Sequence, residues 1–174
     1  LIVIAARPGM GKTSLALNVA QHIAVHGDPV AYFTLEMSRE EVVSRMLCAN
    51  GRIDSQRLRT GRLSESDFTK LSNAASALYK KPIFVDDSPG LTVTEIRAKA
   101  RRMRRRPGLS LIVVDYLQLM QGSGGENRQQ EIADISRSLK SLARELEVPV
   151  IACSQLNRSL EAREDKRPRL GDLR

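Results

Sequence analysis

The sequence predicts an α/β fold, with a mainly parallel, doubly wound sheet and helices on both of its faces. Five short segments are nearly continuous in apolar residues, as expected for strands that are covered on both sides. Helical patterns fill the intervals between these segments. Alternation at this spacing requires right-handed crossovers between parallel strands, which build an open sheet between two helical layers.

The predicted strands are short and rich in β-branched residues. They cover residues 1–5, 30–35, 83–85, 111–115 and 148–153. Two segments resist assignment: residues 121–127, with three glycines, and residues 157–174, with many charges. Both follow predicted strands. Because ligands of such sheets bind beyond the carboxyl ends of the strands, both segments are expected to lie near a site.

The first and last predicted helices are recognised from periodicity. A helix over residues 13–24 has Leu15, Val19, His22 and Ile23 at helical spacing, and Gly27-Asp28-Pro29 ends it. A long polar helix over residues 129–146 leads into the last strand.

Three further helices are predicted from capping boxes, in which a hydroxyl and a carboxyl three residues later cap each other's backbone. The boxes are Ser38 with Glu41, Ser64 with Asp67, and Thr92 with Glu95. The second of these helices is expected to run to about Tyr79, and Pro107-Gly108 stops the third.

Composition restricts the class of protein. The chain has 174 residues, 41% of them hydrophobic, which is typical of one globular domain. Its two cysteines, Cys48 and Cys153, are too few for a disulfide framework, which favours a reducing compartment. Apolar runs are too short for a membrane span or a signal peptide. The net charge of +8 is compatible with a polyanionic partner but does not prove one.

The strongest chemical signal is a glycine-rich segment directly after the first predicted strand and before the first helix. It reads Ala6-Arg7-Pro8-Gly9-Met10-Gly11-Lys12-Thr13, followed by Ser14. Its glycines let backbone N–H groups surround phosphate oxygens at the positive end of a helix. Lys12 is placed to reach the β and γ phosphates, and Thr13 to hold Mg²⁺. Ala6 replaces the usual first glycine, so an ordinary φ is expected there. The alternative is a plain glycine turn beside a surface lysine.

Three polar residues end predicted strands at the same edge of the sheet. Asp115 is placed to hold Mg²⁺ or one of its waters, or else to cap its strand. Glu36 is the candidate to orient or deprotonate an attacking water, or else a carboxylate that complements a helix dipole. Gln155 is placed to sense the γ-phosphate, or else is a turn residue.

Basic residues gather in two segments. Residues 92–106 carry seven positive charges against Glu95, but Val93, Ile96, Ala100 and Met103 form an apolar stripe, which favours a docked surface helix with a solvated basic face. Residues 157–174 carry six positive and four negative charges and are the better candidate to grip nucleic-acid phosphates. Aromatic residues make up only 3% of the chain, so contacts to the nucleic-acid backbone are favoured over base stacking.

Five motifs, in order, resemble the DnaB family of bacterial replicative DNA helicases in its RecA-like motor domain, and the resemblance covers essentially the whole chain. The motifs are residues 6–13, Glu36 within Leu-Glu-Met-Ser, Asp86-Asp87-Ser88-Pro89, Val-Asp-Tyr-Leu-Gln-Leu-Met at residues 114–120, and Ser-Gln-Leu-Asn-Arg at residues 154–158.

The resemblance implies a RecA-like P-loop NTPase that uses ATP and Mg²⁺ for DNA unwinding. Lys12 and Thr13 then bind ATP and Mg²⁺, Glu36 is the catalytic base, Asp115 supports the metal, and Gln155 couples the γ-phosphate to DNA. Residues 121–128 and 160–170 resemble the two pore loops of the family that track single-stranded DNA. The candidate DNA contacts in them are Arg128, Arg163, Lys166 and Arg167.

The resemblance also implies a cytoplasmic homohexameric ring, without a membrane partner, that moves 5′ to 3′ on single-stranded DNA and cooperates with primase and a helicase loader. The family's N-terminal domain and linker helix are expected before Leu1, and its arginine finger after Arg174. Since a finger contributes roughly 10³–10⁵ in rate, residues 1–174 alone are expected to bind nucleotide but hydrolyse it very slowly.

Two other functions stay open at this point. One is a RecA- or KaiC-like ATPase, and the other is a nucleotide-gated DNA-binding module that does not unwind DNA. A small-molecule P-loop kinase fits less well, because it needs an acceptor site and mobile lid arginines rather than a water-activating Glu36.

Overall fold

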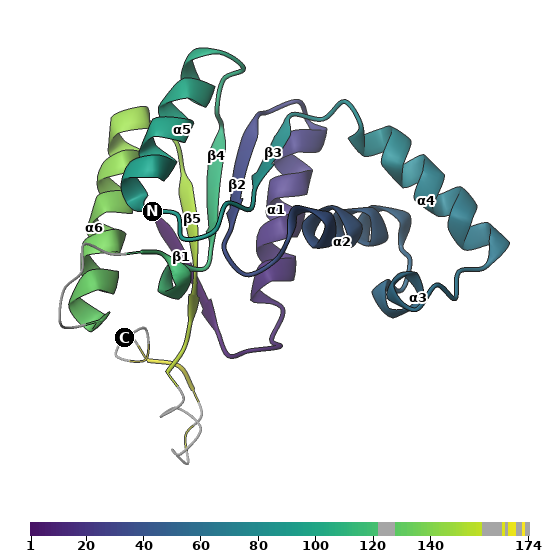
Figure 1. Cartoon of the computed structure of the whole chain (residues 1–174), viewed down its shortest axis with the longest axis horizontal. Coiled ribbons are helices and arrows are strands. Elements are labelled where there is room, and N and C mark those ends of the chain that lie inside the picture. The colour runs from purple at the N-terminus through teal and green to yellow at the C-terminus, as the bar shows by residue number, and fades with distance from the viewer. Residues whose placement is uncertain (122–127, 158–164, 166, 170–171, 173–174) are drawn as a thin grey trace.

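A five-stranded parallel sheet forms the centre of the chain, in the order β1-β5-β4-β2-β3 (Figure 1). The structure is a computed structural model, and it describes residues 1–121, 128–157, 165, 167–169 and 172. The predicted doubly wound α/β fold is confirmed. The strands are β1 (Ile2–Ala6), β2 (Val30–Thr34), β3 (Ile83–Asp86), β4 (Leu111–Asp115) and β5 (Val150–Gln155).

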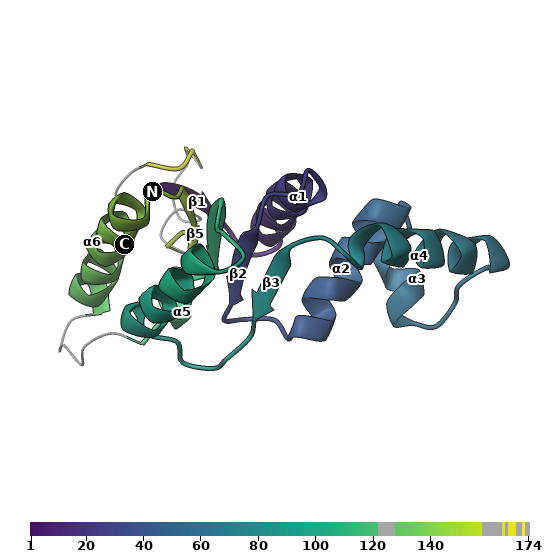
Figure 2. The same cartoon turned by 90° about the horizontal axis from the view of Figure 1, so that it is seen from above.

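Helices cover both faces of the sheet (Figure 2). On one face lie α1 (Lys12–Val25) and α2 (Arg39–Gly51), and on the other lie α5 (Val93–Arg105) and α6 (Arg128–Leu146). The sheet feeds both layers, because alternate side chains of each strand point to opposite faces. All five residues of β4 are buried, and each large aliphatic side chain among them contributes about 1.5–3 kcal/mol. In the described part of the chain, no helix has the length and apolar character needed to cross a membrane.

A helical arm projects from one end of the sheet. It consists of the short α3 (Ser55–Arg59) and α4 (Glu65–Leu78), which contact α2 and extend away from the strands in both views. The sequence analysis missed α3, a five-residue helix that begins at the cap Asp54 and is too short to show a period. It also missed the 3-10 turn η1 (Leu117–Leu119), which follows β4.

The three predicted capping boxes are confirmed at α2, α4 and α5. At α5, the backbone N–H of Glu95 donates to Thr92 Oγ1 over 3.3 Å, and the N–H of Thr92 donates to Glu95 Oε2 over 2.8 Å. Caps of this kind contribute typically about 1 kcal/mol each. Each box also satisfies two of the backbone donors at the start of its helix.

One predicted boundary is wrong. The last strand begins at Val150 rather than residue 148, because Pro149 has no N–H to give to a ladder. The first predicted helix is confirmed as α1, although Leu15 and His22 on it are exposed, and Leu15 is 53% accessible. The buried face of α1 is made mainly of alanines: Ala16, Ala20 and Ala24 are fully buried. Their small side chains let α1 lie close to the sheet.

Candidate nucleotide-binding site

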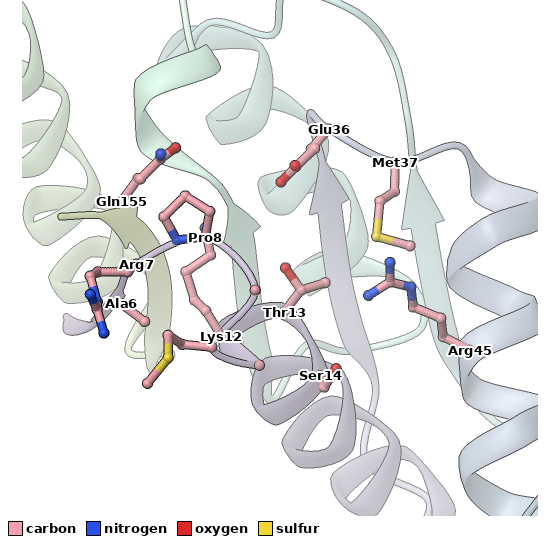
Figure 3. A pocket seen from close by; sticks show the side chains of 13 residues that line it. Ala6, Arg7, Pro8, Lys12, Thr13, Ser14, Glu36, Met37, Arg45 and Gln155 are labelled. Atoms are coloured by element: carbon pink, nitrogen blue, oxygen red, sulfur yellow. The ribbon is translucent and has the colours of Figure 1, made fainter. Parts of the chain in front are cut away.

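The site residues predicted from the sequence converge at the carboxyl edge of the sheet. Since the strands are parallel, the segment after β1, Glu36 after β2, Asp115 at the end of β4 and Gln155 at the end of β5 all reach this edge. A pocket of about 270 Å³ lies there (Figure 3). It is lined by Ala6, Arg7, Pro8, Gly9, Met10, Gly11, Lys12, Thr13, Ser14, Glu36, Met37, Arg45 and Gln155.

The glycine-rich loop leaves the N-terminus of α1 open. Gly9 and Gly11 have φ values of 76° and 83°, which few other residues adopt, whereas Ala6 is the last residue of β1 and has no positive φ, as predicted. Gly11 is the N-cap of α1, no side chain caps this end, and no acidic residue lies in the first turn. The helix therefore presents backbone donors and its positive dipole end to an anion in the pocket.

Lys12 and Asp115 form an ion pair behind the loop. Lys12 Nζ lies 3.6 Å from Asp115 Oδ1 and 4.2 Å from the centroid of the Tyr116 ring. Asp115, only 2% accessible, also accepts a hydrogen bond of 3.2 Å from the hydroxyl of Tyr32 at Oδ2. Burial, reinforced by the charge of Asp115, raises the pKa of Tyr32, so this hydroxyl stays a proton donor. The same two causes raise the pKa of the Cys153 thiol to about 12.

One oxygen of Asp115 is left for a further ligand. Asp115 Oδ1 is buried and accepts no hydrogen bond from the described residues, with Lys12 at 3.6 Å as its ion-pair partner. A buried carboxylate oxygen without a donor is costly, and a hydrated cation satisfies it. The Thr13 hydroxyl lines the pocket one residue after Lys12, and Figure 3 shows it pointing into the same space as Glu36. These donors fit Mg²⁺, which prefers oxygen ligands and retains several waters.

The turn that carries Glu36 is fixed by its neighbours. The Thr34 hydroxyl lies 2.9 Å from the carbonyl of Met37 and accepts a 3.1 Å hydrogen bond from the Met37 N–H. The N–H of Leu35 donates to the carbonyl of Asp115 over 2.7 Å. The Glu36 carboxylate is exposed and lines the pocket opposite the glycine-rich loop (Figure 3). It is therefore held where it can reach a water above a bound phosphate.

Two polar residues of the site were missed by the sequence analysis. Arg45 reaches the pocket from α2, and Figure 3 shows its guanidinium beside Met37. Val42 and Met46 of α2 are buried, and the sequence does not reveal that Arg45, next to Met46, lines the pocket. Gln118 of η1 holds the backbone of Gln155. Its signal was its place three residues after Asp115.

The candidate DNA contacts lie elsewhere or outside the described residues. Arg128 begins α6, and only its backbone is described. Arg163 and Lys166 lie outside the described residues. Arg167 is exposed, its N–H donates to Asp165 Oδ1 over 3.1 Å, and it does not line the nucleotide pocket. Their roles stay predictions.

A parallel sheet with a glycine-rich loop at an open helix end, a buried Lys–Asp pair and a carboxylate opposite defines a P-loop nucleotide-binding domain of the RecA-like type. Comparison with known proteins gives the family. The profile of the DnaB-like helicase C-terminal domain matches residues 1–174, so the chain belongs to this family.

Relatives are similar along the whole chain. The replicative DNA helicase DnaC of Bacillus subtilis is 56% identical, and the replicative DNA helicase DnaB of Geobacillus stearothermophilus is 57% identical. Each match covers all of this chain, which spans 39% of the relative's length. A solved DnaB-like replicative helicase, described with its interactions with primase, matches with a TM-score of 0.93 at 40% identity over all of this chain and 43% of that one. A second solved structure, described as an ATPase domain, matches with a TM-score of 0.92 at 41% identity, over 99% of this chain and 63% of that one.

Proposed function

We propose that the chain is the ATP-hydrolysing motor of a replicative DNA helicase, which moves 5′ to 3′ on single-stranded DNA and unwinds the duplex ahead of it. The observation that carries this proposal is the buried Lys12–Asp115 pair beneath an open helix end, with Glu36 facing it across the pocket. Binding alone needs only the loop. A carboxylate opposite the phosphates adds what hydrolysis needs, a group that orients or deprotonates water.

In this mechanism, the N–H groups of residues 9–13 and the Lys12 ammonium hold the phosphates, and Glu36 takes the proton of the attacking water. Thr13 and Asp115 would hold Mg²⁺, which would neutralise charge on the phosphates. Asp115 Oδ1, which accepts no hydrogen bond from the described residues, would accept one from a water bound to the metal. Arg45 lies on the Met37 side of the pocket and adds a positive charge to its wall.

The partners belong to the same proposal. A homohexamer, single-stranded DNA, primase and a helicase loader fit a replicative motor of the cytoplasm, and the names of the relatives support this role. Arg128, Arg163, Lys166 and Arg167 stay the candidates for contact with the DNA backbone.

The test is Lys12→Ala in the protein expressed from its whole gene. We expect ATP hydrolysis and strand separation to be lost together, with hydrolysis falling at least about 10²-fold, because one preorganised positive contact to the transition state is removed. The measurements are phosphate release and unwinding of a forked duplex. Unwinding that survives the loss of hydrolysis would refute the motor. Hydrolysis without any unwinding by the unaltered protein would favour a nucleotide-gated DNA-binding module.

A further inference from the structure

Strand β4 ends before its neighbour β5 does. The ladder between them pairs Ile112 to Val114 with Val150 to Ala152, and β5 then continues to Gln155. On its other side β5 stays paired with β1, where Ala6 is opposite Gln155 and the N–H of Leu156 donates to the carbonyl of Ala6 over 3.2 Å. The last residues of β5 therefore need a partner on the side that β4 has left.

The side chain of Gln118 fills this place. The N–H of Gln155 donates to Gln118 Oε1 over 3.2 Å, and Gln118 Nε2 donates to the carbonyl of Gln155 over 3.1 Å. One amide side chain thus makes the two hydrogen bonds that a neighbouring parallel strand would make through two of its peptide groups. A third bond, of 2.9 Å, runs from Nε2 to Ser154 Oγ. Gln118 therefore holds the N–H and carbonyl of Gln155 on the β4 side, while the Ala6 carbonyl holds the next N–H, that of Leu156, on the β1 side.

Gln118 is itself held by a well-anchored turn. Its neighbours Leu117 and Met120 are buried in the core under α6. The N–H of Gln121 donates to the carbonyl of Leu91 over 3.4 Å. The turn therefore joins the end of β4, where Asp115 lies, to the end of β5, where Gln155 faces the pocket (Figure 3).

We propose that Gln118 is a positioning residue for hydrolysis. It holds Gln155 at the height above the phosphate loop from which the Gln155 side chain meets the γ-phosphate, and it makes the turn after Asp115 move with Gln155. This inference rests on the proposed function, because Gln155 matters only in a site that hydrolyses a nucleoside triphosphate. Misplacement of a reacting or contacting group by about 1 Å can cost 10²-fold in rate.

The experiment compares Gln118→Leu with the unaltered protein, both expressed from the whole gene. We expect kcat of the DNA-stimulated ATPase to fall about 10- to 100-fold, and KM and the affinity for a fluorescent ATP analogue to stay within about twofold. A structural defect would lower the fraction of active protein and leave KM and the stimulation ratio unchanged. A fall in the ratio of the DNA-stimulated to the basal rate therefore distinguishes a role of Gln118 in hydrolysis from a structural defect.

Two further variants keep the test decisive. Gln56→Leu makes the same change at an exposed position of α3 and is expected to leave all rates unchanged. Gln118→Glu keeps the size and the acceptor for the Gln155 N–H but removes the donor to its carbonyl, so it is expected to give a smaller loss of the same kind even if the leucine variant is unstable. Normal kcat and normal DNA stimulation in the glutamate variant would overturn the proposal.

A double variant tests whether Gln118 acts through Gln155. Once Gln155→Ala has removed the positioned side chain, adding Gln118→Leu is expected to cost less than about twofold more, because nothing remains to be positioned. A second tenfold loss would refute the proposal. The proposed function fails separately, if the unaltered protein does not hydrolyse ATP or if Lys12→Ala hydrolyses it normally.

Discussion

Helices α1 and α5 both start after a strand and a glycine turn, but only α1 makes a binding site. Gly11 leaves the N-terminus of α1 without a side-chain cap. Behind it, the side chain of Lys12, 11% accessible, forms an ion pair with the buried Asp115. At α5, the box of Thr92 and Glu95 satisfies two backbone donors of the helix start, and most of the basic residues of α5 are exposed. Free backbone N–H donors in a pocket therefore define the nucleotide site, whereas the number of positive charges on a helix does not.

Most basic residues of α5 also pair with other groups of the same chain. Arg97 and Arg101 pair with Glu145 of α6, and Lys99 pairs with Asp86 at the end of β3 over 2.6 Å. Arg104 donates to the carbonyl of Leu109. The positive net charge of the sequence thus comes mainly from a helix that packs on its neighbours and has a solvent-exposed face.

The largest expected effect separates binding from hydrolysis at the α1 site. Glu36→Gln keeps the shape of the side chain but removes the proton acceptor, so kcat is expected to fall about 10²–10⁴-fold. Nucleotide affinity, measured by calorimetry, is expected to change less than about twofold. If hydrolysis persists in this variant, water is activated by another group.

The second change strains the glycine-rich loop at the open N-terminus of α1. Gly11→Ala meets no atom within 4 Å but forces an alanine to a φ of 83°, which costs about 1–2 kcal/mol. The loop is expected to relax out of its phosphate-binding form, and nucleotide affinity to fall about tenfold. Thr92→Ala is the matched control at α5: it is expected to lower stability by about 1 kcal/mol and to leave nucleotide affinity unchanged.

A third change tests the paired charges of α5. Burial opposes ionisation of Asp86, but hydrogen bonds from Lys99 and Ser88 outweigh it and lower the pKa of Asp86. A lowered pKa stabilises the fold above the unfolded value of about 3.9, and this contribution is lost as the pH falls through the folded pKa. Lys99→Met is therefore expected to cost about 1 kcal/mol at pH 7 and much less near pH 2. Thermal unfolding at both pH values measures the difference, and an equal loss at both would contradict the pairing.

The smallest effect is expected from the solvated face of α5. Arg102, Arg105 and Arg106 are exposed, so their joint replacement by glutamine is expected to change stability by no more than about 0.5 kcal/mol per site. ATP hydrolysis is expected to stay within about twofold. A clear loss of DNA affinity in this variant would mean that α5 carries a nucleic-acid surface after all.

The sequence predicts those features that local chemistry determines. Capping boxes and the glycine-rich loop each have a signal within eight residues, and they were found where expected. The strands were found in the predicted order, but β5 begins later than predicted and β1 is not buried. The position of the site at one edge of the sheet also follows, because the carboxyl ends of parallel strands lie at the same edge. The proximity of Glu36, Asp115 and Gln155 could therefore be predicted from the order of strands and polar residues along the chain.

Features that depend on packing were missed. Arg45 enters the pocket because of how α2 is rotated, and Gln118 replaces a strand partner only because β4 is shorter than β5 at this edge. Which face of α1 is buried also depends on packing. Apolar periodicity measures how much surface a helix must bury, whereas α1 is placed by how closely its alanines let it approach.

Because α1 lies so close to the sheet, the methyl groups of its three buried alanines determine how far the phosphate loop lies from the strands. Ala16, Ala20 and Ala24 line the contact of α1 with the strands, and the phosphate loop is the continuation of the same helix. Any larger side chain at these positions must lift α1, at a typical cost of about 1–3 kcal/mol in stability. The lift also carries Lys12 away from Asp115. The smallest side chains of α1 thus help to set how far the phosphate loop lies from Asp115.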